Sequence, residues 1–546
     1  MQQQKTVVLR INNIRVGLDS RQGLPQLLSR KLRLPEGSIG KVRVLRKAVD
    51  ARHKSSIVLV YHLLAELRIS EGQKAELLKD PQISEWEEKP EPVPVFGTEG
   101  LASRLIVVGL GPAGLVAALE LAKYGYAPMV VERGRDLAHR IRDVETFWKT
   151  GKLDPVSNVQ FGAGGAGTFS DGKLTTRVND PIMGHLLQLF VDAGAPEEIL
   201  TEQKPHVGTD KLRIMVTGLI HQIKAYGGTV RYETQVTNVR RDAAGGLTEV
   251  ELNGQEWVKC QGLVLACGHS ARDTYQMLLA RGVHLEAKAF AVGVRIEHQQ
   301  ELINRAQYGK FAKHPKLGAA DYALVYHDKA TGRAVYSFCM CPGGQVVASA
   351  SEPGGVVVNG MSPFLRDTGL ANSALVVNVD PKDFPPGPLG GMEFQRKYER
   401  LAYGVSKDYR APAQSSRSYL EGTAPDLKVP FKPSYRPELV AADLKKVLPQ
   451  AVAETLQHGL GVFDRKLPGF GTQGLLIGVE TRTSAPVRIV RGESGESVNC
   501  PGLYPAGEGA GYAGGIMSAA MDGYHQGGAG ECPPARQRGP FPGAPT

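Results

Sequence analysis

One stretch of this chain, residues 104–134, constrains its fold more than any other. It begins with a short apolar run, residues 105–108, which is typical of a buried strand. The sequence GLGPAG follows directly at residues 109–114, and an apolar, alanine-rich segment then continues to Gly125. Residues 128–132 predict a second strand, which ends in Glu132. The stretch therefore predicts a strand, a glycine turn, a helix and a second strand, in that order.

The residues of this turn favour a bound dinucleotide. Gly109 permits a tight turn, Gly111 lets the backbone approach a pyrophosphate, and Gly114 lets the helix pack closely on the strand. The phosphate charge then lies at the helix N-terminus, and Glu132 stands where a carboxylate accepts hydrogen bonds from an adenosine ribose. The alternative is a tight strand–helix turn with an incidental glutamate. These residues alone do not decide between FAD and NAD.

Composition narrows the class of protein. The 546 residues suffice for two or three domains, each with its own core. The net charge of +10 is a mild excess over this length, and an anionic cofactor or substrate accounts for it as well as nucleic acid does. Neither the apolar part of a signal peptide nor a membrane-spanning apolar run is present, so we expect a cytoplasmic protein. The six cysteines show neither zinc-type nor disulfide-framework spacing, and no metal is expected.

Residues 1–97 are predicted to form a separate α+β module. The pattern predicts strands at residues 6–16, 40–49, 56–67 and 93–96, and helices at residues 24–34 and 71–79. This order, βαββαβ, indicates a ferredoxin-like arrangement. Six basic residues gather in its middle: Lys41, Arg43, Arg46, Lys47, Arg52 and Lys54. They indicate a solvated face, with an anion, RNA or partner-docking face as the alternative, and the lack of an aromatic RNA-binding pattern disfavours nucleic acid.

A second glycine-rich loop follows at residues 158–174. Four glycines fall within residues 162–167, so this backbone can lie flat against a ligand. Residues 167–173 also fit the first part of a phosphate-binding P-loop, but Leu174 replaces the Ser or Thr that would hold magnesium, and no apolar strand precedes the loop. An ATPase is therefore rejected. Arg133 and Arg140, before the loop, are candidates for cofactor binding, Arg140 by reaching a phosphate.

Two later stretches return to nucleotide chemistry. Residues 262–268 run from an apolar strand into Ala266-Cys-Gly268, which indicates a second close approach of the backbone to a dinucleotide. Residues 501–515 contain Gly507 and Glu508, a glycine run and the start of a helix of small residues. This arrangement places one acid near a ribityl chain and a helix N-terminus at a ring carbonyl.

The region between residues 289 and 469 has a different character, with strands, few long helices and many Pro and Gly turns. Cys339 and Cys341 are expected on one face of a strand there. The pattern leaves open whether they are packed thiols beside a ligand, a redox or nucleophilic pair, or metal ligands. A disulfide between residues two apart is strained.

Together these signatures resemble the two-dinucleotide-domain flavoproteins of the glutathione-reductase-like superfamily. The turn at residues 109–114 with Glu132 resembles that family's FAD site for ADP, residues 266–268 resemble its second motif, and residues 504–508 resemble its terminal motif, with Glu508 in place of the usual aspartate. The strings FGAGGAGTFSDGKL, SFCMCPGG, VVNGMS and TRTSAPVRI are similar to those of poorly characterised FAD-dependent dehydrogenases that carry an N-terminal α+β module. The resemblance extends to about residue 525.

The resemblance implies FAD as cofactor, with contacts from most of these motifs. The implied cofactor-binding residues, together with those named above, are Pro112 and Ala113 in the turn, Gly164, Gly165, Thr168 and Ser170 at the isoalloxazine or pyrophosphate, Val236 at the adenine, and Gly515 and Ile516 at the pyrimidine edge. Only one strand–turn–helix fingerprint is convincing. NAD(P)H, if it serves as a transient electron donor or acceptor, therefore binds without a Rossmann domain of its own.

The expected fold class is α/β. A discontinuous Rossmann-like FAD-binding domain, residues 98–288 and 471–526, is expected to hold an inserted mixed α+β substrate or cap domain, residues 289–470. The N-terminal module, residues 1–97, precedes it, and a disordered tail, residues 527–546, follows it.

The expected function is that of an FAD-dependent oxidoreductase, a dehydrogenase or reductase, acting on a small organic substrate. The alternative is a flavin-containing RNA-modification or binding factor that uses the basic N-terminal module. For catalysis, Lys173 is a candidate for stabilising negative charge on the reduced flavin, and Cys339 or Cys341 for an acid or a redox relay. Arg482 is a candidate for clamping an anionic substrate. The substrate, the electron partner and the oligomeric state stay open.

Overall fold

The computed structural model describes residues 5–87, 101 and 103–529. Contacts within the chain divide it into two compact units. The first unit contains the N-terminal module and two short segments from elsewhere, Pro196–Pro205 and Asn304–Ala320, and the second contains the rest. None of the helices among the described residues combines the length and the apolar character that a membrane crossing requires.

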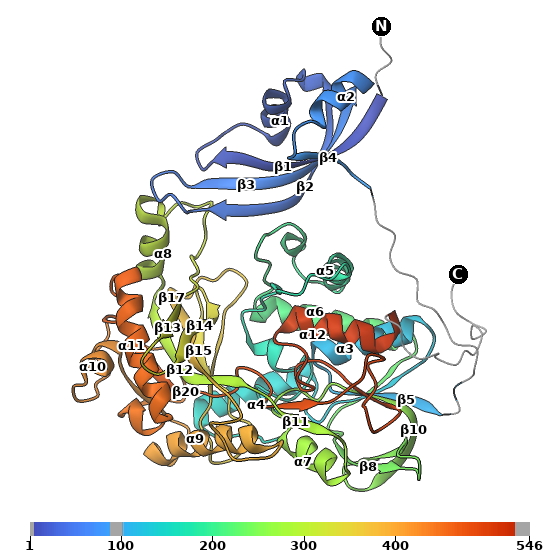
Figure 1. Ribbon diagram of the computed structural model, residues 1–546, viewed down its shortest axis with the longest axis vertical. Coiled ribbons are helices and arrows are strands. Elements are labelled where there is room, and N and C mark those ends of the chain that lie inside the picture. Colours follow the sequence, from blue (N-terminus) through green and yellow to red (C-terminus); the bar gives the residue numbers. More distant parts are fainter. Residues whose placement is uncertain (1–4, 88–100, 102, 530–546) are drawn as a thin grey trace. The chain divides into compact units, whose positions relative to one another are not determined.

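The first unit is built on an antiparallel four-stranded sheet with the order β2-β3-β1-β4 (Figure 1). Its elements along the chain are β1 (Lys5–Gly17), α1 (Leu24–Leu32), η1 (Glu36–Ser38), β2 (Ile39–Asp50), β3 (Val58–Ile69), α2 (Glu71–Leu77) and β4 (Ile83–Glu85). Alternate residues of β1 and β3, such as Leu9, Ile11 and Leu63, are fully buried. This element order and strand order are those of a ferredoxin-like sheet.

Two features of this unit differ from the expectation. Its fourth strand is Ile83–Glu85, whereas residues 93–96, where a strand was predicted, lie outside the described residues. The segment at residues 196–205 was expected in the FAD-binding domain, but the backbone N–H of Lys47 donates to the carbonyl of Thr201 at 2.6 Å and its Nζ pairs with Glu202 at 2.9 Å. Local sequence patterns do not predict a pairing between residues this far apart in the chain.

The second unit contains a seven-stranded sheet with a parallel centre. The parallel strands are β7 (Thr229–Arg231), β6 (Met129–Val131), β5 (Arg104–Val108), the end of β10 (Glu256–Leu265) and β22 (Leu503–Pro505). The first half of β10 continues into an antiparallel meander with β9 (Leu247–Leu252) and β8 (Val236–Arg241). The predicted strand, turn, helix and strand at residues 104–132 are therefore β5, the turn, α3 (Pro112–Lys123) and β6.

Three helices cover this parallel centre. α3 packs against both α6 (Thr209–Ala225) and α12 (Ile516–Tyr524), and the three lie side by side in Figure 1. Because α3 is covered by helices and by the sheet, its residues from Ala113 to Ala122 are all buried. This burial explains why α3 is apolar on every side rather than along one stripe.

A second seven-stranded sheet forms the other half of this unit. Its strands, in spatial order, are β13 (Val325–Asp328), β14 (Arg333–Cys341), β17 (Leu370–Val379), β12 (Phe290–Gln299), β20 (Leu475–Glu480), β18 (Ala411–Ser415) and β19 (Leu439–Ala441). The inserted domain was expected to end at residue 470, but β20 pairs with the central strand β12 and so extends this domain to Glu480. β11 (Leu285–Ala287), which precedes β12 in the chain, pairs with β21 (Val487–Ile489), which follows β20.

Further helices and one hairpin lie between or after these strands in the chain. They are α4 (Leu137–Thr150), α5 (Met183–Asp192), α7 (Arg272–Ala280), α8 (Gln300–Tyr308), α9 (Gly390–Ser406), α10 (Ser416–Glu421), α11 (Gln450–Lys466), and the hairpin of β15 (Gln345–Ala348) and β16 (Val358–Met361). The division between the units falls within α8. A last turn covers His525–Ala529, and Gly528 within it has a non-helical φ of 129°, so the first residues of the expected disordered tail are only partly helical. The rest of that tail lies outside the described residues.

Substitution of Gly523 in α12 tests how closely this helix packs on α3, and Gly404 in α9 provides the control. A Cβ atom at Gly523 of α12 would lie 2.1 Å from the carbonyl oxygen of Ala113, so Gly523→Ala must force the helices apart. We expect this overpacking to lower the free energy of unfolding by about 1–3 kcal/mol, measured in urea. The control is Gly404→Ala in α9, where nothing lies within 4 Å of the added Cβ. It should be neutral or stabilising by up to about 1 kcal/mol, since alanine favours helix, and equal losses in both variants would contradict the packing.

Candidate functional site

Three parallel strands end side by side at one edge of the first sheet of the second unit. β10 lies between β5 and β22, and its last residue, Leu265, is opposite both Val108 and Pro505. The residues that follow, among them Gly109 and Ala266, open onto a cavity of about 400 Å³. The crevice at the carboxyl ends of parallel strands is where nucleotides bind in open α/β sheets.

Most of the residues singled out from the sequence line this cavity. They are Gly109, Gly111, Pro112, Ala113, Glu132, Arg133, Gly165, Ser170, Lys173, Val236, Ala266, Gly268, Cys339, Arg482, Gly507, Glu508, Gly515 and Ile516. The ones that do not line it are Gly114, Arg140, Gly164, Thr168 and Cys341. Chain segments that are far apart in sequence, from Gly109 to Ile516, thus meet at one site.

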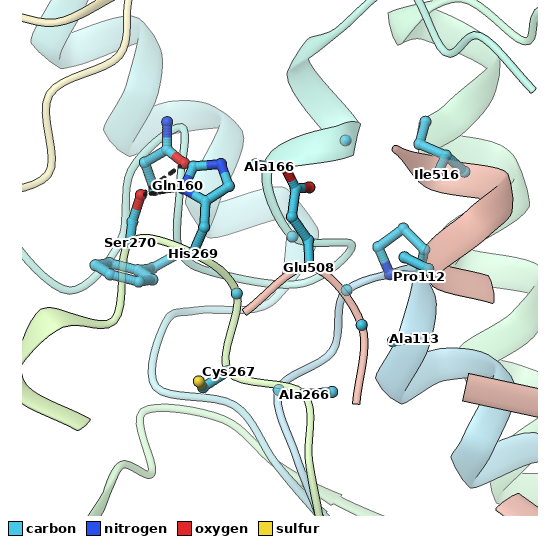
Figure 2. Close-up of a pocket in the computed structure, with 18 of the residues that line it drawn as sticks. Pro112, Ala113, Gln160, Ala166, Ala266, Cys267, His269, Ser270, Glu508 and Ile516 are labelled. Carbon is cyan, nitrogen blue, oxygen red and sulfur yellow. Dashed lines mark hydrogen bonds between the residues drawn. The ribbon is translucent and has the colours of Figure 1, made fainter. Parts of the chain in front are cut away.

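The cavity has distinct ends. Figure 2 shows Pro112, Ala113 and Ile516 on one side, Gln160, His269 and Ser270 on the other, and Glu508 between them. The Ser270 hydroxyl contacts both Gln160 Oε1 and His269 Nδ1 at 3.1 Å. Burial, with help from nearby arginines, lowers the pKa of His269 to about 3. This lowered pKa favours the neutral imidazole at pH 7, and the contact with Ser270 gives it a hydrogen-bond partner.

The glycine turn is shaped by close backbone contacts. Gly109 has a φ of +94°, and a Cβ there would lie 2.3 Å from the carbonyl oxygen of Ala266. A Cβ at Gly114 would lie 1.9 Å from the carbonyl oxygen of Gly109, so Gly114 serves helix packing and does not reach the cavity. The N-terminus of α3, at Gly111, Pro112 and Ala113, lines the cavity, and the first N–H groups of an α-helix have no partner within the helix. This cradle fits the pyrophosphate of a dinucleotide.

Glu132 accepts backbone hydrogen bonds that stabilise the glycine turn. Its Oε1 accepts the backbone N–H groups of Gly134 and Gly162, each at 2.9 Å, and its Oε2 accepts that of Leu110 at 2.9 Å. A carboxylate has about four acceptor positions, so three are used by the protein. The fourth is on Oε2, and because Glu132 lines the cavity it is available to a ribose hydroxyl. Glu132 therefore fits both the structural and the binding role.

The structure corrects the expected role of Arg140. Its side chain is wholly buried and does not line the cavity. It donates instead to the backbone carbonyls of Asn158, Val159 and Ala163 at 2.9, 2.9 and 2.6 Å. Burial lowers the pKa of Arg140 to about 9, against the opposing charge of Glu132. A guanidinium committed in this way shapes the glycine loop and does not reach a phosphate.

Two residues of the glycine-rich loop also face away from the cavity. A Cβ at Gly164 would lie 2.2 Å from Thr168 Oγ1 and 2.9 Å from Val216 of α6. Gly164 and Thr168, which were expected at the isoalloxazine or pyrophosphate, therefore pack against each other and against α6 and do not line the cavity. Gly165 and Ser170 are the members of this loop that line the cavity.

Arg482 lines the cavity, but its charge is already paired. Its Nε and one terminal nitrogen contact the two carboxylate oxygens of Glu399 at 3.1 and 3.0 Å, and its other terminal nitrogen donates to Ser270 at 3.0 Å. Glu399 also pairs with Arg272 at 2.7 Å. Burial would raise the pKa of Glu399, yet the two arginines outweigh it and hold that pKa far below its usual range. The expected clamp on an anionic substrate is thus replaced by a buried ion network.

Lys173, Cys339 and Glu480 meet at the wall contributed by the second sheet. Lys173 Nζ donates to the carbonyl of Met340 and pairs with Asp171 at 3.0 Å. Burial would lower the pKa of Lys173, but Asp171 and the two cysteines raise it overall. Burial raises the pKa of Glu480 to about 7, although Arg295 pairs with its Oε2 at 3.0 Å. This wall therefore has a fixed cation and an acid that titrates near neutrality.

The two cysteines do not follow simple strand alternation. The pairing of β14 with β17 shifts register between Phe338 and Cys341, and Cys339 has a φ of +45°. Because of this irregularity, Cys339 lines the cavity while Cys341 is fully buried. Glu508 lies within the electrostatic reach of Cys339, and burial raises the pKa of Glu508 to about 7.

Several lining residues were missed from the sequence, among them Gln160, Phe338, Asn359, Glu480 and Thr483. Asn359 lies in the VVNGMS string, and Glu480 and Thr483 flank Arg482. The four sequence strings quoted above include or adjoin some of these residues. The sequence alone, however, does not distinguish a residue that lines a cavity from one that packs behind it.

Comparisons with known proteins agree with this site. Residues 289–483 match the family described as FAD-dependent protein, C-terminal domain-like, and residues 8–66 match a domain of unknown function, DUF8436. The chain is also 47% identical, over 521 residues, to an uncharacterized protein of Clostridium beijerinckii, covering 95% of this chain and 97% of that one. The chain belongs to the same family as this clostridial protein. The FAD-dependent family match confirms the expectation of FAD as cofactor.

Solved structures show only distant similarity. Aklavinone-11 hydroxylase with FAD and aklavinone has a TM-score of 0.34 and 14% identity, covering 79% of this chain and 62% of that one. The 3-ketosteroid-Δ4-(5α)-dehydrogenase of Rhodococcus jostii has a TM-score of 0.33 and 12% identity, covering 81% and 100%. Scores this low do not establish a common fold or activity.

Glu132→Gln tests the anchoring of the turn. The amide of glutamine would point an NH₂ group at backbone donors and remove charge-assisted hydrogen bonds worth about 1.5–3 kcal/mol each. We expect the Kd for FAD to rise by roughly 10- to 100-fold, measured by fluorescence titration of the apoprotein. Glu249→Gln is the matched control, because Glu249 pairs with Arg240 on the meander at 2.7 Å and does not line the cavity. An unchanged Kd in Glu132→Gln would contradict the assignment.

Glu399→Gln tests the buried ion network. Removing one carboxylate leaves Arg272 and Arg482 facing each other, and we expect a loss of about 3–5 kcal/mol in the free energy of unfolding at pH 7. Because the folded-state pKa of Glu399 is depressed, its contribution is present above the ordinary glutamate pKa and is lost as the pH falls. The deficit should therefore shrink under acid conditions. In the control, Glu393→Gln, a half-exposed ion pair with Arg396 is broken, at a cost of about 0–1 kcal/mol.

Proposed function

We propose that this protein is an FAD-dependent oxidoreductase, a dehydrogenase or reductase, that acts on a small organic substrate. The observation that carries the proposal is one cavity lined both by the dinucleotide turn and by residues of the FAD-dependent family domain, which are Phe338, Cys339, Asn359, Glu480, Arg482 and Thr483. A bound FAD supplies hydride or electron transfer. The chain supplies the binding surface and the groups that handle protons.

The residues that line the cavity support a position for FAD along it. Gly111 and the N-terminus of α3 suit the pyrophosphate, and Glu132 suits the adenosine ribose. The wall with Phe338, Cys339 and Asn359 lies within the matched family domain and is left for the reacting ring and the substrate. A dehydrogenation needs a proton acceptor or donor beside the site of hydride transfer.

Glu480 and Glu508 are suited to that proton transfer. Both line the cavity, and burial raises the pKa of each to about 7, so each exchanges a proton readily at neutral pH. Lys173 keeps its positive charge at the same wall and favours an anion beside it. NAD(P)H remains a candidate as a transient electron donor or acceptor.

Anaerobic stopped-flow absorbance tests the reaction class. The purified holoprotein is mixed separately with NADPH and NADH, and the flavin band near 450 nm is followed. We expect one nucleotide to bleach the band in a reductase, whereas in a dehydrogenase only the organic substrate does so. Protein that has been reconstituted with FAD and washed, yet shows no flavin absorbance, would contradict the proposal. Free FAD, released by heat and identified by chromatography, is the independent check on the cofactor.

A further inference from the structure

Two thiols occur together on the cavity wall contributed by β14. Cys339 lines the cavity and is half-buried, while Cys341 is fully buried beside it. The Cys341 thiol donates to the backbone carbonyl of Cys339 at 3.3 Å. Both cysteines are free in the structure. We call Cys339 and Cys341 the thiol pair.

The backbone brings the thiol pair together. In an extended strand, residues two apart are separated by about 6.6 Å, at about 3.3 Å per residue. That spacing is near the upper end of the Cα separations that disulfides span, about 4.4–6.8 Å. The left-handed φ of +45° at Cys339 interrupts the extended conformation at the register shift of β14, so the pair does not have regular strand geometry.

Two cations surround the thiol pair. Lys173 Nζ donates to the carbonyl of Met340, between the two cysteines. Arg295 donates to the carbonyl of Cys339 at 3.3 Å and to the sulfur of Cys341 at 3.8 Å. The hydrogen bond from Cys341, with help from Lys173 and Arg295, lowers the pKa of Cys339 to about 5 despite burial. The same partnership raises the pKa of Cys341.

Cys267 is a natural comparison within the same cavity. It also lines the cavity, but burial raises its pKa to about 12. Burial likewise raises the pKa of Cys260 to about 12. Among the cysteines that the structure describes, Cys339 alone has a lowered pKa, and its backbone carbonyl accepts the thiol of Cys341. Since the thiolate is the nucleophilic form, Cys339 is the reactive sulfur of this set.

We infer that the thiol pair is a redox-active dithiol that exchanges with small disulfides entering the cavity. The Cys339 thiolate attacks one sulfur of a disulfide RSSR, forming a mixed disulfide and releasing RS⁻. Cys341 then attacks the sulfur of Cys339, and its proton goes to the second departing RS⁻. The protein disulfide forms, one RSSR is reduced to RS⁻ and RSH, and atoms, charge and electrons balance.

The thiol pair is suited to repeated oxidation and reduction rather than to a permanent disulfide cross-link. A disulfide across two residues is strained, and strained disulfides have higher reduction potentials and are readily reduced again. The roles of the two sulfurs differ, because only Cys339 faces the cavity. Cys339 is therefore the attacking sulfur and Cys341 the resolving one. The exchange does not depend on the oxidoreductase reaction proposed above.

The test uses the full-length holoprotein and glutathione disulfide as the probe. After incubation at pH 7 and alkylation of the remaining thiols, peptide mass spectrometry should find an internal 339–341 disulfide. Cys341→Ser should instead accumulate a glutathione adduct on Cys339, because the resolving thiol is gone. Cys339→Ser should form neither product at a comparable rate. The thiol of Cys267 serves as the internal control and should stay unmodified.

A pH series separates a reactive thiolate from mere accessibility. Alkylation of Cys339 by iodoacetamide should be nearly independent of pH between 6 and 8, whereas an ordinary cysteine, with a pKa of about 8.5, reacts roughly tenfold faster per pH unit there. The inference is overturned if folded protein forms no 339–341 disulfide, if Cys339→Ser traps the adduct on Cys341 equally fast, or if Cys267 reacts first. Flavin absorbance is followed throughout, so failure of the thiol chemistry and failure of the flavin reaction are told apart.

Discussion

Two buried charges hold the cofactor cradle in shape, and the rest of the site depends on them. Glu132 accepts the N–H of Gly162 at 2.9 Å, while Arg140 donates to the carbonyl of the same residue at 3.2 Å. The glycine-rich loop is thus held by a carboxylate on one side and a guanidinium on the other. Each charge is satisfied mainly by backbone groups. The geometry of the turn is therefore fixed before any ligand binds, which lowers the entropy cost of binding.

A second charge network joins the two sheets of the larger unit. Arg272 follows the Ala-x-Gly strand β10, Arg482 follows β20, and Glu399 comes from α9, so one carboxylate links three elements from different parts of the chain. Because all three groups are buried, removing one leaves an uncompensated charge. The ion network therefore couples the position of the sheet edge that carries the glycine turn to the position of the second sheet, which contributes the cavity wall at β14. A cavity whose two walls come from different sheets needs such a link.

The sequence predicted the local parts of this site and missed the relations between distant ones. The turn at residues 109–114, the strand before it and the acid after it follow from glycine stereochemistry and apolar periodicity, both of which are local. The order of elements in the N-terminal module also follows from periodicity. Arg140 and Arg482 were misjudged because the partner of a charged side chain is set by the tertiary fold, here backbone carbonyls and Glu399. The extension of the inserted domain to Glu480 was missed for the same reason, since β20 is identified only by its pairing with β12.

The thiol pair shows how a local irregularity can define chemistry. A regular strand would place Cys339 and Cys341 on one face, with equal access to any ligand. The register shift against β17 breaks that equivalence, so Cys339 lines the cavity, while Cys341 is buried and its thiol donates to the backbone carbonyl of Cys339. The irregularity also directs the carbonyl groups of Cys339 and Met340 at Arg295 and Lys173, whose charges then favour a thiolate. The difference between the two sulfurs thus arises from the backbone, and the cations only increase it.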